Sequence, residues 1–176
     1  QDGFQYHNNL ELIFNSLGIN CVQNKVTLEQ VDNVVDKLKT QKFIKNDFWS
    51  FINLIKLMFD HNCIGEDTYQ AIFDLADALE QNPNSKIYQK ISTAKFIKGQ
   101  VYFKQEKYEL SKDMYIESFK ITQNDYEAMN TAIIQFINKD KYAQALEILD
   151  FAEKLYHKDF KYKIDWLKLG DNFQGL

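Results

Sequence analysis

The strongest constraint on how this chain folds is a stretch of sequence that occurs twice, 34 residues apart. The tripeptide Glu106-Lys107-Tyr108 recurs as Asp140-Lys141-Tyr142. Apolar residues around both copies have helical spacing, so each copy is expected to form a pair of antiparallel helices. A period of this length is typical of chains in which such helix pairs stack in a row. The matched positions around the two copies are Tyr102 with Phe136, Ser111 with Ala145, Tyr115 with Leu149, and Ser118 with Ala152.

In its length and in these positions the repeat resembles the tetratricopeptide repeat (TPR), whose helices present small residues where they cross closely. Gly99 matches the small position of the first helix. The match has gaps: Lys95 and Lys98 stand where the family has Trp and Leu, and Ile133 replaces glycine in the second copy. The resemblance implies an all-α fold, a right-handed superhelix of antiparallel helix hairpins. An ordinary helical bundle is the alternative. The residues expected to pack the repeats together are Gly99, Tyr102, Tyr108, Ser111, Tyr115, Ser118, Phe136, Tyr142, Ala145, Leu149 and Ala152.

The chain before the repeats also has the apolar spacing of helices. A first short helix is expected from Leu10 to Leu17, and Gly18 is expected to end it. Thr27 and Gln30 have the spacing of a capping box, which predicts the start of a second helix. The side chains expected to point inward from that helix are Leu28, Val31, Val34, Val35 and Leu38.

A helix from Phe48 to Asp60 should be central, because apolar residues, Trp49 among them, surround most of it. Asn46 and Asp47 are expected to cap it. A helix near Thr68 to Glu80 and a turn at Asn82-Pro83-Asn84-Ser85 should follow. Further helices are predicted near 86–104, 107–123, 125–138, 140–157 and 159–170.

Two repeats cannot bury both of their own faces, so the earlier helices should stack on them. We therefore expect one helical-repeat domain over 1–176. It would comprise N-terminal hairpins at 8–81, two TPR-like repeats at 86–157 and a C-terminal capping helix at 159–172.

Composition excludes several classes of function. The chain has no Arg and a net charge of −4, which gives little electrostatic support for binding nucleic acid. No apolar run is long enough to span a membrane. The sequence lacks a nucleophile elbow, a phosphate-binding glycine loop and metal-ligand spacing around His61. Acidic residues such as Glu147 are expected on solvated helix faces, and no pair of Asp or Glu lies in an apolar stretch where desolvation would raise a pKa for acid–base catalysis. We therefore expect no catalytic residue, no cofactor and no metal site.

Cys21 and Cys63 allow two interpretations. In a reducing cytosol they would be small buried thiols. In an oxidising compartment they would form a disulfide between two loops at helix ends, worth about 4 kcal/mol by the chain-entropy model. Their separation of 42 residues excludes a C-x-x-C redox pair.

Aromatic and basic residues supply the candidate partner-binding positions. Tyrosine is favoured at interfaces, and lysines give the helix near 86–104 a basic side that would suit an acidic partner. The alternatives are packing in the core for the tyrosines and a solvated face for the lysines. The candidates are Tyr88, Lys95, Lys98 and Tyr126.

The order of several short segments along the chain supports a second resemblance to a known family. Gly18-Ile19-Asn20-Cys21, Asp60-His61-Asn62-Cys63 and Ala78 to Pro83 precede the repeats. This order resembles the soluble C-terminal tail of bacterial membrane-embedded O-antigen ligases and O-oligosaccharyltransferases, over roughly 8–157. The resemblance implies a periplasmic location, a membrane domain upstream of residue 1 and paired cysteines. Glycosyl transfer in that family belongs to the membrane portion, so no catalytic residue corresponds to a position here.

We interpret the chain as a non-catalytic TPR-like protein–protein interaction module. One setting is the periplasmic domain of such a glycan-transferring enzyme, in protein glycosylation or surface polysaccharide assembly; the partner would be a protein or peptide. Two alternatives stay open. The first is a free-standing cytoplasmic scaffold or secretion chaperone with free thiols. The second is a helical small-ligand-binding protein or enzyme, with a deep cavity and a buried carboxylate of shifted pKa near Trp49 or Trp166.

Overall fold

The computed structural model describes residues 9–83, 89–123 and 125–168, with side chains from Leu10 to Leu155 within those ranges. This part of the chain is all-helical and contains no strand. None of its helices has both the length and the apolar character needed to cross a membrane. The helices are α2 (Asn9–Val22), α3 (Leu28–Thr40), α4 (Lys45–His61), α5 (Thr68–Gln81), α6 (Gln89–Lys104), α7 (Tyr108–Ile121), α8 (Tyr126–Asn138) and α9 (Tyr142–Lys168), with a short 3-10 turn, η1 (Gly65–Asp67), before α5.

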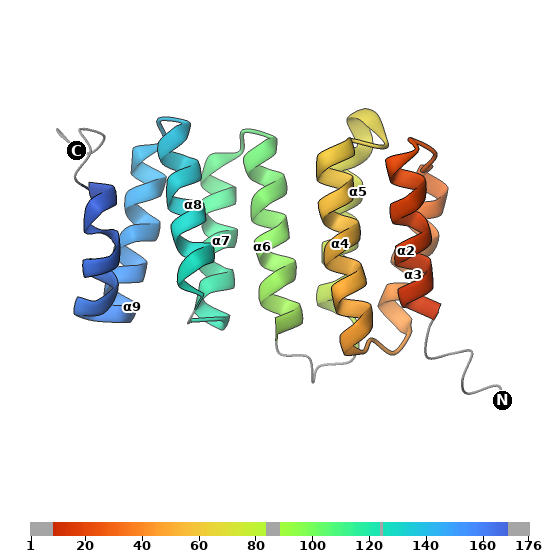
Figure 1. Ribbon diagram of the computed structural model, residues 1–176, viewed down its shortest axis with the longest axis horizontal. Helices are drawn as coiled ribbons and strands as arrows, with labels where there is room; N and C mark the ends of the chain where they lie inside the picture. Colours follow the sequence, from red (N-terminus) through yellow and green to blue (C-terminus); the bar gives the residue numbers. More distant parts are fainter. Residues whose placement is uncertain (1–8, 84–88, 124, 169–176) are drawn as a thin grey trace.

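The helices form two layers in a row (Figure 1). In this view α2, α4, α6 and α8 lie in front, and α3, α5, α7 and the first part of α9 lie behind. Consecutive helices run in opposite directions, so each hairpin contributes one helix to each layer. Contacts within the layers join α2 to α4, α3 to α5 and α7 to α9, and contacts between the layers join α5 to α6, α6 to α7 and α8 to α9.

The buried apolar side chains form two clusters that meet in α6. Ala94, Ile97 and Val101 of α6 belong to the cluster built by α2 to α5. Phe103, near the end of the same helix, belongs to the cluster built by α7, α8 and α9. The helix α6 is therefore the element through which the N-terminal hairpins pack against the repeated part of the chain.

The two copies of the repeat form the same turn. Glu106 and Asp140 both have a left-handed backbone, with φ of 60° and 58°. The N–H of Lys107 donates to the carbonyl of Tyr102 and that of Lys141 to the carbonyl of Phe136, both at 2.9 Å. This pattern is the Schellman motif, in which a left-handed residue ends a helix and its neighbour bonds back to the last turn. The 34-residue period therefore appears in the backbone as well as in the sequence.

The expected end of the first helix is wrong. The helix α2 continues through Gly18 to Val22. A Cβ atom on Gly18 would lie 3.0 Å from Cδ1 of Leu57, so the glycine allows α4 to approach α2 closely. The prediction treated Gly18 as a helix end, whereas it serves the packing of two helices.

The second helix begins as predicted, but one of its inward residues is misplaced. The capping box of Thr27 and Gln30 is present, with each side chain bonded to the backbone N–H of the other residue. Val31, Val34, Val35 and Leu38 are buried, whereas Leu28 is 44% exposed. Leu28 occupies the first position of α3, where the helix has not yet reached the core.

The start of α4 also differs from the prediction. The N-cap is Ile44, not Asn46 or Asp47, and the helix begins at Lys45. Asp47 lies in the first turn, where its carboxylate accepts a hydrogen bond from the N–H of Ile44 at 2.8 Å. Trp49, expected in a central position, is 60% exposed and lines a cavity together with residues of α6.

At the C-terminal side, the bounds of the helices differ from the predicted ones. The structure has one helical element, α9, from Tyr142 to Lys168, in place of helices at 140–157 and 159–170. Its ribbon turns back within this range, so that its last part runs in the opposite direction to its first part (Figure 1). The predicted positions 84–86, with the Ser85 cap, and 169–172 lie outside the described residues.

Cys21 and Cys63 form a disulfide. Cys21 lies in the last turn of α2, not in a loop, and Cys63 follows the end of α4. Both residues are buried. The bond thus links the ends of two helices that already pack side by side in one layer.

Candidate binding groove between α4 and α6

The crossing of α6 and α7 depends on small residues in both helices. A Cβ atom on Gly99 would lie 2.7 Å from the ring of Tyr115, so only glycine fits without a shift. The hydroxyl of Ser111 donates to the carbonyl of Gly99 at 2.7 Å, and that of Ser118 donates to the carbonyl of Ser92 at 2.7 Å. Serine is therefore small enough for the crossing and also satisfies its own polar group there.

The second copy uses alanine where the first uses serine. Ala145 and Ala152 are fully buried on α9, and Ile133 of α8 fills the space that glycine would leave. The other repeat positions are buried or half-buried. The buried ones are Gly99, Ser111, Tyr115, Ser118, Phe136, Ala145, Leu149 and Ala152, and the half-buried ones are Tyr102, Tyr108 and Tyr142.

Two lysines expected to meet a partner are already paired within the chain. Lys95 contacts Glu80 at 2.8 Å, and Lys98 contacts Asp77 at 2.8 Å and Glu80 at 2.7 Å. Burial lowers the pKa of Lys98, but hydrogen bonds and charges from Asp77 and Glu80 outweigh this effect and raise it overall. Lys95 and Lys98 therefore join α6 to α5, and their assignment to partner binding stays a prediction.

The two tyrosine candidates have different outcomes. Tyr88 lies outside the described residues. Tyr126 is half-buried and packs against the cluster of α7 to α9, so much of its ring contributes to the core.

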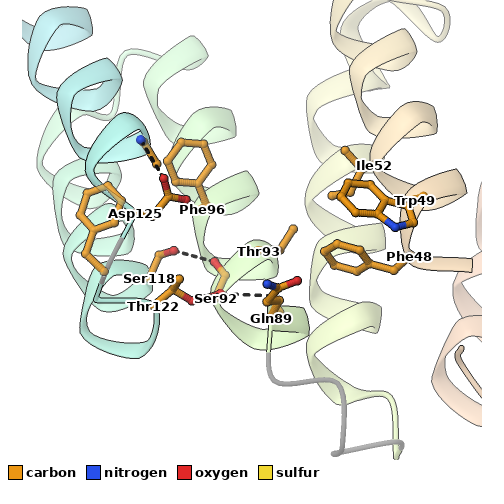
Figure 2. A pocket seen from close by; sticks show the side chains of 12 residues that line it. Phe48, Trp49, Ile52, Gln89, Ser92, Thr93, Phe96, Ser118, Thr122 and Asp125 are labelled. Atoms are coloured by element: carbon orange, nitrogen blue, oxygen red, sulfur yellow. Dashed lines mark hydrogen bonds between the residues drawn. The ribbon is translucent and has the colours of Figure 1, made fainter. Parts of the chain in front are cut away.

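A groove lies between α4 and α6, which both pack on α5. It consists of two cavities of about 320 and 510 Å³ that share Ile52, Thr93 and Phe96. Figure 2 shows the smaller cavity, with Phe48, Trp49 and Ile52 of α4 on one side and Thr93 and Phe96 of α6 on the other. The smaller cavity is also lined by Gln89, Ser92, Ser118, Phe119, Thr122, Asp125 and Ala128, and the larger by Ile55, Lys56, Phe59, Asp60, Ile97, Gln100, Lys104 and Gln135.

The walls of the groove follow from helical spacing. Ile52, Lys56 and Asp60 are four residues apart on α4, as are Phe96, Gln100 and Lys104 on α6, so each set forms a row along its helix. The ring of Phe96 is held at its back by Tyr115, with centroids 5.0 Å apart. The middle of the groove is therefore apolar, and its wider end is polar.

At the wider end of the groove, a buried tyrosine holds one of the lining side chains in place by a hydrogen bond. Tyr115 is fully buried, and its hydroxyl donates to Oε1 of Gln135 at 2.9 Å. Burial raises the pKa of Tyr115, so its hydroxyl remains protonated and keeps donating to the amide oxygen. This bond fixes the amide oxygen of Gln135 toward Tyr115, and the amide nitrogen supplies hydrogen-bond donors at this end of the groove.

The polar residues of the groove are hydroxyl, amide, lysine and carboxylate side chains. Its lining contains no His or Cys, and its carboxylates, Asp60 and Asp125, lie in different cavities. Within the described residues, no cluster of His, Cys, Asp and Glu is suited to hold a metal ion. The groove can bind an elongated molecule through apolar contact and hydrogen bonds.

One carboxylate outside the groove is desolvated. Asp47 is 1% exposed, and burial raises its pKa despite the hydrogen bond from Ile44. Its Oδ1 has no hydrogen-bond partner among the described residues. Asp47 lines neither cavity of the groove, and its Oδ2 serves the start of α4.

Comparisons of the chain with protein-family models, curated proteins and solved structures give no match. The site therefore rests on its own geometry. Sequence reasoning missed the groove because it placed the apolar residues of the helix from Phe48 to Asp60, Trp49 among them, at the centre of the fold. The one signal that could have found it is the apolar character of α4 on nearly all sides, more than a single packed face requires.

Proposed function

We propose that this chain is a non-catalytic, TPR-like protein–protein interaction module that binds a peptide segment of its partner in the groove between α4 and α6. The observation that supports this most is Trp49. Its side chain is 60% exposed at the edge of an apolar groove. Exposed tryptophan beside a groove is typical of binding surfaces, because the large ring contributes much contact area once water is excluded.

The form of the groove suits a peptide. Its central residues are apolar, and Lys56, Lys104, Asp60 and Asp125 lie toward its ends. An apolar centre with a polar rim is the usual anatomy of a protein interface. We propose that an apolar side chain of the partner packs on Ile52 and Phe96 while its backbone bonds to the rim.

The finer fold assignment is part of the same proposal. The identical turns at Glu106 and Asp140 and the buried small residues of α7 and α9 support a TPR-like superhelix of stacked hairpins. In such an array the front layer would form one continuous face. The groove would be the part of that face where two neighbouring hairpins are furthest apart.

The disulfide supports an oxidising compartment, because such bonds are rare in proteins of the reducing cytosol. We propose a periplasmic location on this basis. A role as the tail domain of an O-antigen ligase or O-oligosaccharyltransferase stays a prediction from the sequence resemblance.

The rival function as an enzyme gains no support from Asp47, because that carboxylate belongs to the start of a helix and not to the groove.

A peptide library tests the proposal. Twelve-residue random peptides displayed on phage are selected against the oxidised protein, and fluorescein-labelled copies of the selected peptides are titrated with each variant by fluorescence polarisation. Thr93→Lys places a long side chain in the region shared by both cavities, and we expect it to weaken binding at least about tenfold. Thr40→Lys makes the same change on α3, which lines neither cavity, and should leave binding unaltered.

Two outcomes would contradict the proposal. The first is that no peptide is selected above an unrelated helical protein. The second is that selected peptides bind Thr93→Lys and the parent protein equally well. Circular dichroism and thermal melting of both variants establish that each is folded.

A further inference from the structure

The wider end of the groove gathers hydrogen-bond donors from three helices. Lys56 of α4, Lys104 of α6 and Gln135 of α8 all line the larger cavity. Among the described residues, neither lysine forms an ion pair, whereas Lys98 on another face of α6 is paired with Asp77 and Glu80. Both lysines are exposed. The amide nitrogen of Gln135 is the third donor, and the bond from Tyr115 fixes the orientation of that amide.

The charges of the groove differ between its ends. The wider end has two lysines and one carboxylate, Asp60, whereas the narrower end has only the carboxylate of Asp125. The wider end is thus locally positive on a chain whose net charge is −4. A negatively charged group is favoured at the wider end and disfavoured beside Asp125.

We infer that the partner is an acidic peptide segment that places an Asp or Glu side chain among Lys56, Lys104 and Gln135. The inference rests on the proposed function and adds the chemistry of the partner to it. An apolar side chain of the same segment packs on Ile52 and Phe96, in the part common to both cavities.

The spacing of the two recognised side chains follows from helix geometry. Phe96 and Lys104 are eight residues apart on one helix, about 12 Å along its axis at 1.5 Å per residue. An extended peptide advances about 3.3 Å per residue. The acidic residue should therefore lie three or four positions from the apolar one.

The same phage selection tests this inference when its sequences are counted by position. Peptides fused through their C-termini to the phage coat protein have no free terminal carboxylate, so any negative group must come from a side chain. We expect Asp or Glu to be enriched three or four positions from an aromatic or aliphatic residue. Enrichment of basic residues, or no enrichment of acidic ones, overturns the inference while leaving peptide binding in the groove intact.

Synthetic peptides with amidated C-termini give the quantitative test. The selected acidic peptide and its Asp→Asn or Glu→Gln form are titrated with the parent protein and with the double variant Lys56→Gln, Lys104→Gln. We expect the double variant to lose about tenfold in affinity for the acidic peptide and to bind the neutral peptide as the parent does.

The double variant Lys25→Gln, Lys39→Gln is the matched control, since it removes the same charge from exposed lysines outside both cavities. An equal loss of affinity in this control overturns the inference, because the effect would then come from net charge alone. An equal loss for the neutral peptide also overturns it, because the lysines would then act on the peptide backbone. Failure to select any peptide at all would instead count against the proposed function.

Discussion

Gly99 lies so close to Tyr115 that a Cβ atom on the glycine would stand 2.7 Å from Cδ1 of the tyrosine ring. This contact sets how near α6 and α7 can approach. It also holds Tyr115 where its ring supports Phe96 and its hydroxyl orients Gln135. A residue with no side chain thus determines the positions of Phe96 and Gln135, two of the residues that line the groove.

The variant Gly99→Ala should lower the free energy of unfolding by about 1–2 kcal/mol. The added methyl group cannot be accommodated, because Tyr115 is fully buried and cannot move aside. Overpacking of this kind costs about 1–3 kcal/mol, of which alanine recovers about 1 kcal/mol through its helix propensity. Chemical denaturation monitored by circular dichroism measures the change.

Gly18→Ala is the matched control for that variant. Its Cβ atom would meet only the end of the Leu57 side chain, at 3.0 Å. Leucine can rotate away, so we expect Gly18→Ala to be close to neutral. If both variants lose the same free energy of unfolding, the contact between Gly99 and Tyr115 is not what determines how closely α6 packs on α7.

Glu106→Gly should stabilise the protein by about 0.5–1 kcal/mol. Glu106 has φ of 60°, a left-handed backbone that costs about 1 kcal/mol for a residue with a side chain and almost nothing for glycine. The side chain of Glu106 is exposed, so little contact is lost. A lower melting temperature for this variant would show that the turn does not have the Schellman geometry.

Sequence periodicity was sufficient to predict an all-helical chain, and it singled out small residues in the repeats that are buried. Ser111, Ser118, Ala145 and Ala152 are all buried as small residues at a helix crossing should be. The 34-residue offset identified them without any structure, because helix contacts recur with the repeat. Helix boundaries were harder to predict. Glycine is common at helix ends, so Gly18 was predicted to end a helix, and only the position of Leu57 in the structure shows that Gly18 lies at a contact between two helices.

The groove could not be predicted, because it depends on which apolar side chains remain uncovered. Trp49 and Phe51 are both apolar and two residues apart, yet Trp49 is exposed and Phe51 is fully buried. That difference arises from the packing of α4 on α2 and α5, a tertiary effect without a local signal. The pairing of Lys98 with Asp77 and Glu80 was missed for the same reason, since these residues belong to different helices.

Glu80 gives a prediction for the pH dependence of stability. Burial favours its neutral form, but hydrogen bonds and charges from Lys95 and Lys98 outweigh this effect and lower the pKa below its usual value of 4.5. A lowered folded-state pKa stabilises the protein above pH 4.5, and this stabilisation is lost as the pH falls through the folded-state pKa. The parent should therefore exceed Glu80→Gln in stability near neutral pH, with the difference shrinking below pH 4.5.

Urea denaturation at a series of pH values measures this difference. Glu127→Gln, at an exposed position of α8, is the control for loss of one carboxylate. A stability difference between parent and Glu80→Gln that stays constant from neutral to acid pH would contradict the assigned role of the Lys95–Glu80–Lys98 contacts.

Removing the disulfide by the double variant Cys21→Ser, Cys63→Ser should cost about 2–4 kcal/mol. The bond closes a loop of 42 residues, which restricts the unfolded chain by about 4 kcal/mol in the chain-entropy model. A reducing agent should lower the melting temperature of the parent by a similar amount and leave the double variant unchanged. Equal melting temperatures for the oxidised and reduced parent would show that the two thiols are not bonded in solution.

The most direct test of peptide binding in the groove is the accessibility of Trp49. The chain has two tryptophans, so Trp166→Phe leaves Trp49 as the only indole. In this variant, a saturating amount of a selected peptide should reduce the acrylamide quenching constant by about twofold or more, because the bound peptide covers the indole. The further change Thr93→Lys should abolish that protection. Undiminished quenching of Trp49 while polarisation reports a saturated complex would contradict the account.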